Sequence, residues 1–165
     1  MFRSVQAADV ERAPVEPRRW TGVVTYVVDG DTLYVRPEGG GKPRSVRVLG
    51  IDAPEICQAG GEASRRALQS HALNQEVTIL TQRMDDYGRD LARIDLRESD
   101  LALWMVGQGQ AWAYPAGRAR GEYAAAQREA RRQARGLFAD AAAEPPNAFR
   151  QRHGSCWRPR LQQAR

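Results

Sequence analysis

Three short segments of this chain carry side chains that could do chemistry on a phosphate ester. They are residues 29–32 (DGDT), 47–55 (RVLGIDAPE) and 86–89 (DYGR). Their carboxylates are oxygen ligands of the kind that hard divalent cations prefer, and their arginines present a planar fork that fits a phosphate group. Carboxylates and arginines together indicate a site for cutting phosphodiesters, provided that the fold brings the three segments to one place.

The pattern of apolar and turn residues predicts a mainly β protein with helices. β-branched and aromatic runs favour strands, and Asp29-Gly30 predicts a type I′ hairpin turn, in which both central residues need positive φ. We expect strands over residues 21–28, 32–35, 45–51, 76–81 and 91–96, and helices over residues 62–73, 101–106 and 122–135. Five short strands, with a helix between the third and fourth, are typical of a five-stranded Greek-key barrel of the OB-fold type, here with three helices.

The chain reads as one domain with two extensions. Residues 1–19 are polar and contain two prolines, so we expect a disordered N-terminal arm. Residues 20–140 form the predicted OB-fold domain, and residues 141–165 form a basic tail that we expect to be poorly ordered. The net charge of +5 comes from the last third of the chain, where residues 117–165 hold 11 Arg and four acidic residues. A basic balance favours a polyanionic partner, but a genome-wide codon bias toward Arg explains the arginines at least as well.

The apolar runs and the two cysteines bear on the cellular compartment. The chain contains no run of about 18 apolar residues, so we expect no membrane span, and its N-terminus lacks the apolar run of a secretory signal. We therefore expect a cytoplasmic protein by default, or an exported one if a leader is missing from this chain. For Cys57 and Cys156 we expect two free thiols; the alternative is a disulfide between them, which requires an oxidising compartment.

The order and spacing of the motifs resemble the staphylococcal nuclease (thermonuclease) family. The matching segments are DGDT at 29–32, RxLGIDAPE at 47–55 and YGR at 87–89, with further matches within 108–111 and 126–138. The resemblance covers residues 21–139. It implies an OB barrel with extra helices and calcium-dependent cleavage of DNA and RNA, and we expect a monomer.

The resemblance also implies a metal site built from few protein atoms. It places the carboxylates of Asp31 and Asp52 on Ca²⁺, together with the backbone carbonyl of Ala53. Water and the substrate phosphate would complete the roughly six to eight oxygen positions that calcium prefers. Taken alone, Asp31 is more typical of a turn aspartate that hydrogen-bonds its own backbone, but Asp52 and Glu55 in register favour the metal ligand.

The remaining site residues follow from the same resemblance. Glu55 is expected to activate or position the attacking water. Arg47 and Arg89 are expected to bind the phosphate and stabilise the negative charge that grows on its oxygens in the transition state. Tyr87 and Tyr114 are candidates to hold the nucleotide, although core packing is an equal alternative for Tyr114.

We therefore predict a metal-dependent nuclease with low sequence specificity that leaves 3′-phosphates. One alternative is an OB-fold module that binds nucleic acid without cutting it, but a degenerate domain should have lost one of the five polar site residues, and this chain keeps all five. A second alternative is a protein-interaction domain that docks through its Arg-rich tail. Two departures from the family's best-known member bear on substrate access: Asp86 replaces a lysine, and the loop of residues 56–61 is shorter.

Overall fold

The computed structural model describes residues 17–115 and 121–156 of the chain. Its strands are β1 (Arg18–Val27), β2 (Thr32–Pro37), β3 (Arg44–Val48), β4 (Ile51–Asp52), β5 (Glu76–Met84), β6 (Asp90–Leu96), β7 (Ser99–Asp100) and β8 (Trp112–Ala113). Its helices are α1 (Gly61–Ala72), α2 (Leu101–Gly107), α3 (Gly121–Arg132), the 3₁₀ helix η1 (Gly136–Ala139) and α4 (Pro146–His153). None of the helices in these ranges is long and apolar enough to cross a membrane.

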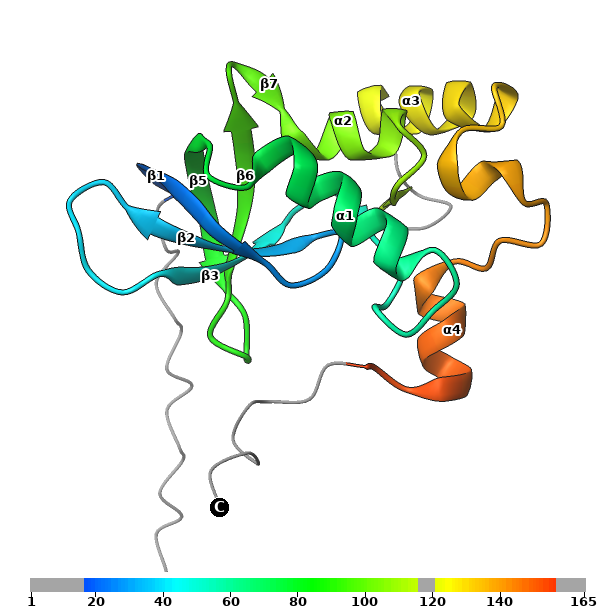
Figure 1. Cartoon of the computed structure of the whole chain (residues 1–165), viewed down its shortest axis with the longest axis horizontal. Coiled ribbons are helices and arrows are strands. Elements are labelled where there is room, and N and C mark those ends of the chain that lie inside the picture. The colour runs from blue at the N-terminus through cyan, green and yellow to red at the C-terminus, as the bar shows by residue number, and fades with distance from the viewer. Residues whose placement is uncertain (1–16, 116–120, 157–165) are drawn as a thin grey trace, which may run out of the picture.

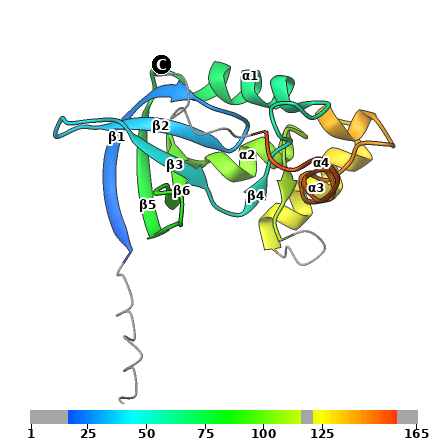
Figure 2. The ribbon, with the colours of Figure 1, turned by 90° about the horizontal axis from the view of Figure 1, so that it is seen from below.

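The main sheet closes on itself as a barrel. Its strands lie in the order β3-β2-β1-β5-β6-β7, and a parallel pairing between β3 and β6 joins the two sides. The five long strands are those expected from the sequence, so the predicted OB-type barrel is confirmed. The short strands β4 and β8 pair with each other outside this sheet. Figures 1 and 2 show the main sheet on one side of the molecule and α3 and α4 on the other.

Alternating side chains build the core inside the barrel. On β6, for example, Ala92, Ile94 and Leu96 point inward and are at most 3% exposed, while the residues between them reach the outside. The inward residues of the other long strands and the apolar faces of α1 and α2 join the same cluster. This packed barrel is the rigid support on which the strand ends hold the three motifs.

The turn after β1 differs from the sequence prediction. Neither Asp29 nor Gly30 has positive φ, so the predicted type I′ turn is wrong. Glycine is required here by packing instead: a Cβ at Gly30 would overlap the Ser64 hydroxyl and lie 2.7 Å from the Ala53 side chain. The close approach presses this turn against α1 and against the segment that follows β4.

The C-terminal part of the chain also differs from the prediction. Within the tail expected to be poorly ordered, Pro146 occupies the first turn of α4, where its fixed φ favours helix formation. The expectation of free thiols is wrong, because Cys57 and Cys156 form a disulfide with their Cα atoms 5.9 Å apart. With α4, the described ranges contain four α-helices, one more than the three expected. At the N-terminus, β1 starts at Arg18, inside the arm predicted over residues 1–19; residues 1–16 and 157–165 lie outside the described residues.

Candidate active site

A cavity of about 550 Å³ gathers side chains from all three sequence motifs. It is lined by Asp29, Asp31, Arg47, Asp52, Ala53, Pro54, Glu55, Tyr87, Arg89, Arg150 and Ser155. Four of these residues carry carboxyl groups and three carry guanidinium groups. Seven of the eight residues predicted from the sequence therefore lie around one cavity, and the eighth, Tyr114, does not.

Arg47 connects two of the predicted metal ligands. The β2–β3 register places Thr32 opposite Arg47, which brings Asp31 beside the arginine. Arg47 Nη1 lies 2.8 Å from Asp31 Oδ2, and Nη2 lies 3.3 Å from Asp52 Oδ1. Burial alone would lower the pKa of Arg47, but the neighbouring carboxylates of Asp31 and Asp52 outweigh it and raise this pKa above its ordinary value. The guanidinium is therefore permanently charged.

Backbone and hydroxyl groups fix the orientation of Asp31. The amide of Ala53 donates to Asp31 Oδ2 at 2.7 Å, and the Thr32 hydroxyl donates to Oδ1 at 3.1 Å. The turn-aspartate alternative is not what the structure shows, since the Asp31 carboxylate accepts a bond from a segment 22 residues away. The neighbouring Asp29 is half-buried, and this burial, with the charge of Asp31, raises its pKa to about 8.

The carboxylate oxygens at the cavity wall suit a hard cation. Asp31 and Asp52 are only 5% and 3% exposed, and they present oxygen atoms at the cavity wall. Oxygen is the ligand that calcium prefers. Among the described residues no group of three or more His, Cys, Asp or Glu side chains is arranged to hold a metal. A cation here would therefore have few protein ligands and space for a phosphate or water.

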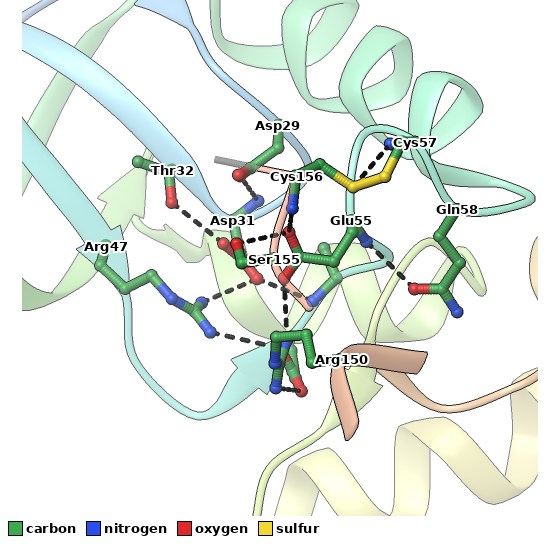
Figure 3. A network of polar contacts seen from close by, with 12 residues as sticks. Asp29, Asp31, Thr32, Arg47, Glu55, Cys57, Gln58, Arg150, Ser155 and Cys156 are labelled. Atoms are coloured by element: carbon green, nitrogen blue, oxygen red, sulfur yellow. Dashed lines mark hydrogen bonds and ion pairs between the residues drawn. A yellow bond between two sulfur atoms is a disulfide. The ribbon is translucent and has the colours of Figure 1, made fainter. Parts of the chain in front are cut away.

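Glu55 follows β4 on a short loop and reaches the same cavity (Figure 3). Its Oε1 accepts a hydrogen bond from Arg150 Nη1 at 3.1 Å. Its Oε2 accepts from the Ser155 hydroxyl at 3.1 Å and from the Cys156 amide at 3.3 Å. The C-terminal segment thus supplies all of these donors. Sequence reasoning did not predict these donors, because they lie about a hundred residues away along the chain. One sign was the Cys57–Cys156 disulfide weighed as an alternative, which ties the C-terminal segment to the loop after Glu55.

A second missed residue, Asp85, holds the turn that carries Tyr87 and Arg89. Asp85 Oδ1 accepts from the amides of Tyr87 and Arg89, both at 2.9 Å, and Oδ2 accepts from Arg89 Nε at 2.8 Å. Burial would raise the pKa of Asp85, but these hydrogen bonds from Arg89 and Tyr87 and the Arg89 charge outweigh it and lower the pKa. The Arg89 guanidinium lies 5.4 Å from the centre of the Tyr87 ring. The local signal was the DDYG turn sequence, whose first aspartate is a typical turn acceptor.

Two residues singled out from the sequence lie away from the cavity. Tyr114 is half exposed, and its amide donates to the Gly50 carbonyl at 2.9 Å. This places Tyr114 just after β8, beside the strand pair that holds Asp52, but not in the cavity lining. Asp86 is exposed and is also absent from the lining.

Comparison with known proteins decides the family. The family model described as "Staphylococcal nuclease homologue" matches residues 45–140. The chain belongs to the staphylococcal nuclease family. This nuclease-family chain is 35% identical to an "Uncharacterized endonuclease" of Haemophilus influenzae over 127 residues, which cover 77% of this chain and 71% of that protein. It is 34% identical to a "Micrococcal nuclease" of Shigella flexneri over 143 residues, covering 78% and 79% of the two chains.

The family match includes most, but not all, of the residues around the cavity. Arg47, Asp52, Glu55 and Arg89 fall within residues 45–140. The β1–β2 turn precedes the matched span and α4 follows it. Arg150 is therefore a cavity residue that the matched part of the family pattern does not contain.

Proposed function

We propose that this staphylococcal nuclease family member is a calcium-dependent nuclease that hydrolyses phosphodiester bonds of DNA and RNA with low sequence specificity. The observation that carries the proposal is the ion-pair network of Asp31, Arg47 and Asp52 inside a cavity that also receives Glu55 and Arg89. Relatives at about one-third identity bear the names endonuclease and micrococcal nuclease. A carboxylate pair that can hold a cation and two arginines that can bind a phosphate would together stabilise the charge that develops when a phosphodiester is hydrolysed.

Asp31, Asp52 and the carbonyl of Ala53 would hold the calcium ion. Both carboxylates are buried and already oriented, Asp31 by the Ala53 amide and Asp52 by its place on β4. A bound calcium ion would polarise the phosphoryl group and stabilise the charge that develops on it. The fold would therefore bring these oxygen ligands together at one place.

Arg47 and Arg89, which both line the cavity, would bind the scissile phosphate. Arg47 projects from β3, and Arg89 lies just before β6, held by Asp85. β3 and β6 are directly paired in the barrel, so both guanidinium groups belong to one rigid unit. Such preorganised donors stabilise the growing charge on the non-bridging oxygens more than they stabilise the substrate.

Glu55 would position the attacking water and accept its proton. The 5′ oxygen would then leave, so the products would carry 3′-phosphates. Tyr87 is 68% exposed at the cavity edge and stands beside Arg89, where its ring would contact the sugar or base. Base–aromatic contact tolerates every base, which agrees with low sequence specificity.

The test is cleavage of labelled single-stranded and duplex DNA and RNA by the full chain in calcium, in magnesium and in a chelator. We expect cleavage of both nucleic acids in calcium, no cleavage in the chelator, and 3′-phosphate ends on the products. Asp31→Asn should lose most of the calcium-dependent rate, while Asp86→Asn, on the exposed turn, should keep it. Binding of intact substrate that does not depend on calcium would instead identify a nucleic-acid-binding module.

A further inference from the structure

The C-terminal segment returns to the cavity and contacts the carboxylates that the proposed reaction uses. We call residues 144–156, which include α4, the C-terminal strap. Arg150 Nη1 lies 3.0 Å from Asp52 Oδ1, and Nη2 lies 2.8 Å from Asp52 Oδ2. Nη1 also donates to Glu55 Oε1 at 3.1 Å. Figure 3 shows the Arg150 guanidinium below Glu55 in this network.

The strap engages every carboxylate oxygen of Asp52 and Glu55. Arg150 donates to both oxygens of Asp52 and to one oxygen of Glu55. The other Glu55 oxygen accepts hydrogen bonds from Ser155 and Cys156. Arg–carboxylate pairs with two parallel hydrogen bonds are among the stronger polar contacts in proteins. In this arrangement Asp52 already has a cationic partner, and Glu55 has no oxygen without a donor from the strap.

Two anchors hold the strap in this position. The disulfide joins Cys156 to Cys57, a residue only two positions after Glu55. At the other end of the strap, Gln58 Nε2 donates to the Glu144 carbonyl at 2.7 Å. A covalent tether raises the effective concentration of the attached group at its target. The disulfide therefore keeps Arg150 next to Asp52 even when its hydrogen bonds break for a moment.

We propose that the C-terminal strap is an autoinhibitory element, in which Arg150 competes with the divalent cation for Asp52. While Ser155 and Cys156 donate to Glu55, the strap also keeps this carboxylate from binding the attacking water. This inference rests on the proposed calcium-dependent function. A divalent cation and the guanidinium would repel each other at the same carboxylate, so metal binding and strap binding oppose each other. Loss of the disulfide weakens strap binding and therefore favours binding of the metal at Asp52.

The first test measures calcium affinity by isothermal titration calorimetry, without substrate. Hydrogen bonds to charged groups correspond to about 10- to 100-fold in an equilibrium constant, so Arg150→Gln should bind calcium about 10- to 100-fold more tightly than the wild type. Arg132→Gln is the matched control, because Arg132 is exposed and pairs with Glu129 on α3, outside the strap and the cavity lining. It should bind calcium as the wild type does.

The second test removes the tether with the double variant Cys57→Ser, Cys156→Ser, which keeps the Cys156 backbone donor. Its calcium affinity should rise, but less than in Arg150→Gln, because an untethered Arg150 can still return to Asp52. Hydrogen–deuterium exchange of α4 should become faster when calcium is added to the wild type, since the ion displaces Arg150.

The outcomes separate the two proposals. Equal or weaker calcium binding by Arg150→Gln, with measurable binding in the wild type, would overturn the autoinhibitory role and leave the calcium site in place. It would point to Arg150 as a group that supports the site. Absence of calcium binding in every variant would overturn both the calcium dependence and the competition. Unchanged affinity in the double serine variant would show that the disulfide does not set the strength of inhibition.

Discussion

Arg47 lies between Asp31 and Asp52 and forms an ion pair with each, at 2.8 Å and 3.3 Å. One guanidinium thereby joins the β1–β2 turn to β4. It is oriented further by the carbonyls of Val48 and Ile51, to which Nη1 donates at 3.4 Å and 3.3 Å. The group that would bind the phosphate is thus fixed by the same carboxylates that would hold the cation.

Replacing Arg47 with lysine should abolish most of the activity while the protein stays folded. Lysine keeps the charge but cannot span two carboxylates and a phosphate with a rigid fork. We expect the cleavage rate at saturating calcium to fall about 10²- to 10³-fold, as when one preorganised transition-state donor is lost. Arg66→Lys is the control, because Arg66 is exposed and lies 3.7 Å from Glu62 on α1. Equal rates in the two variants would contradict the role of Arg47.

Asp85 should act as a positioning residue for Arg89. The variant Asp85→Asn weakens the bond to Arg89 Nε and loosens the turn that carries Tyr87. Since a hydrogen bond to a charged group corresponds to about 10- to 100-fold, kcat/KM for an oligonucleotide should fall by about tenfold or more. Asp86→Asn removes the same charge from the exposed neighbour and should not lower kcat/KM. A similar fall in both variants would mean that the effect comes from net charge.

The turn at Gly30 should tolerate no side chain. In Gly30→Ala the new methyl would overlap the Ser64 hydroxyl and crowd Ala53, and such overpacking costs about 1–3 kcal/mol. Urea unfolding should show this loss in the free energy of unfolding. Gly39→Ala is the control, because a Cβ at Gly39 meets nothing within 4 Å. Equal stability of Gly30→Ala and the wild type would show that the turn can move away from α1.

His71 should make the stability depend on pH. Its ring stacks on Trp104 with centroids 3.7 Å apart, and partial burial and the charge of Arg97 lower its pKa. The unfolded chain therefore takes up this proton at a higher pH than the folded protein does. The contribution of His71 to the free energy of unfolding is fully present above its ordinary pKa of 6.5. It is lost as the pH falls through the lower pKa that His71 has in the folded protein.

The measurement is the Tm of the wild type and of His71→Phe between about pH 8 and about pH 5. Phenylalanine keeps an aromatic ring next to Trp104 but binds no proton. The Tm of the wild type should fall more than that of the variant over this range. Parallel curves would show that His71 titrates alike in the folded and unfolded states.

The barrel could be predicted from the sequence because its signals are local. β-branched runs, alternation and turn residues each occupy fewer than about ten residues, and the long strands formed close to where these signals lie. Seven of the eleven residues that line the cavity could be predicted because three short motifs resemble one family in order and spacing. The short pair β4 and β8 could not, since two residues in each strand give no periodicity.

The errors lie where contacts between distant segments decide the structure. The Asp29-Gly30 pair has the composition of a hairpin turn, but packing against Ser64 and Ala53 selects a different backbone. The C-terminal segment reads as a basic tail, yet Arg150 finds partners 95 and 98 residues away and Cys156 bonds to Cys57. Nothing in the local sequence near Arg150 indicates these partners.

The most direct test of the central claim is single-turnover cleavage of an oligonucleotide in saturating calcium by Glu55→Gln. Glu62→Gln on α1 is the matched control, because Glu62 pairs with Arg65 on the helix surface. If Glu55 activates the water in a calcium-dependent nuclease, Glu55→Gln should bind the oligonucleotide normally and cleave it about 10²- to 10⁴-fold more slowly, and Glu62→Gln should match the wild type. Cleavage by Glu55→Gln at the wild-type rate, or no cleavage by the wild type in calcium, would contradict the proposed function.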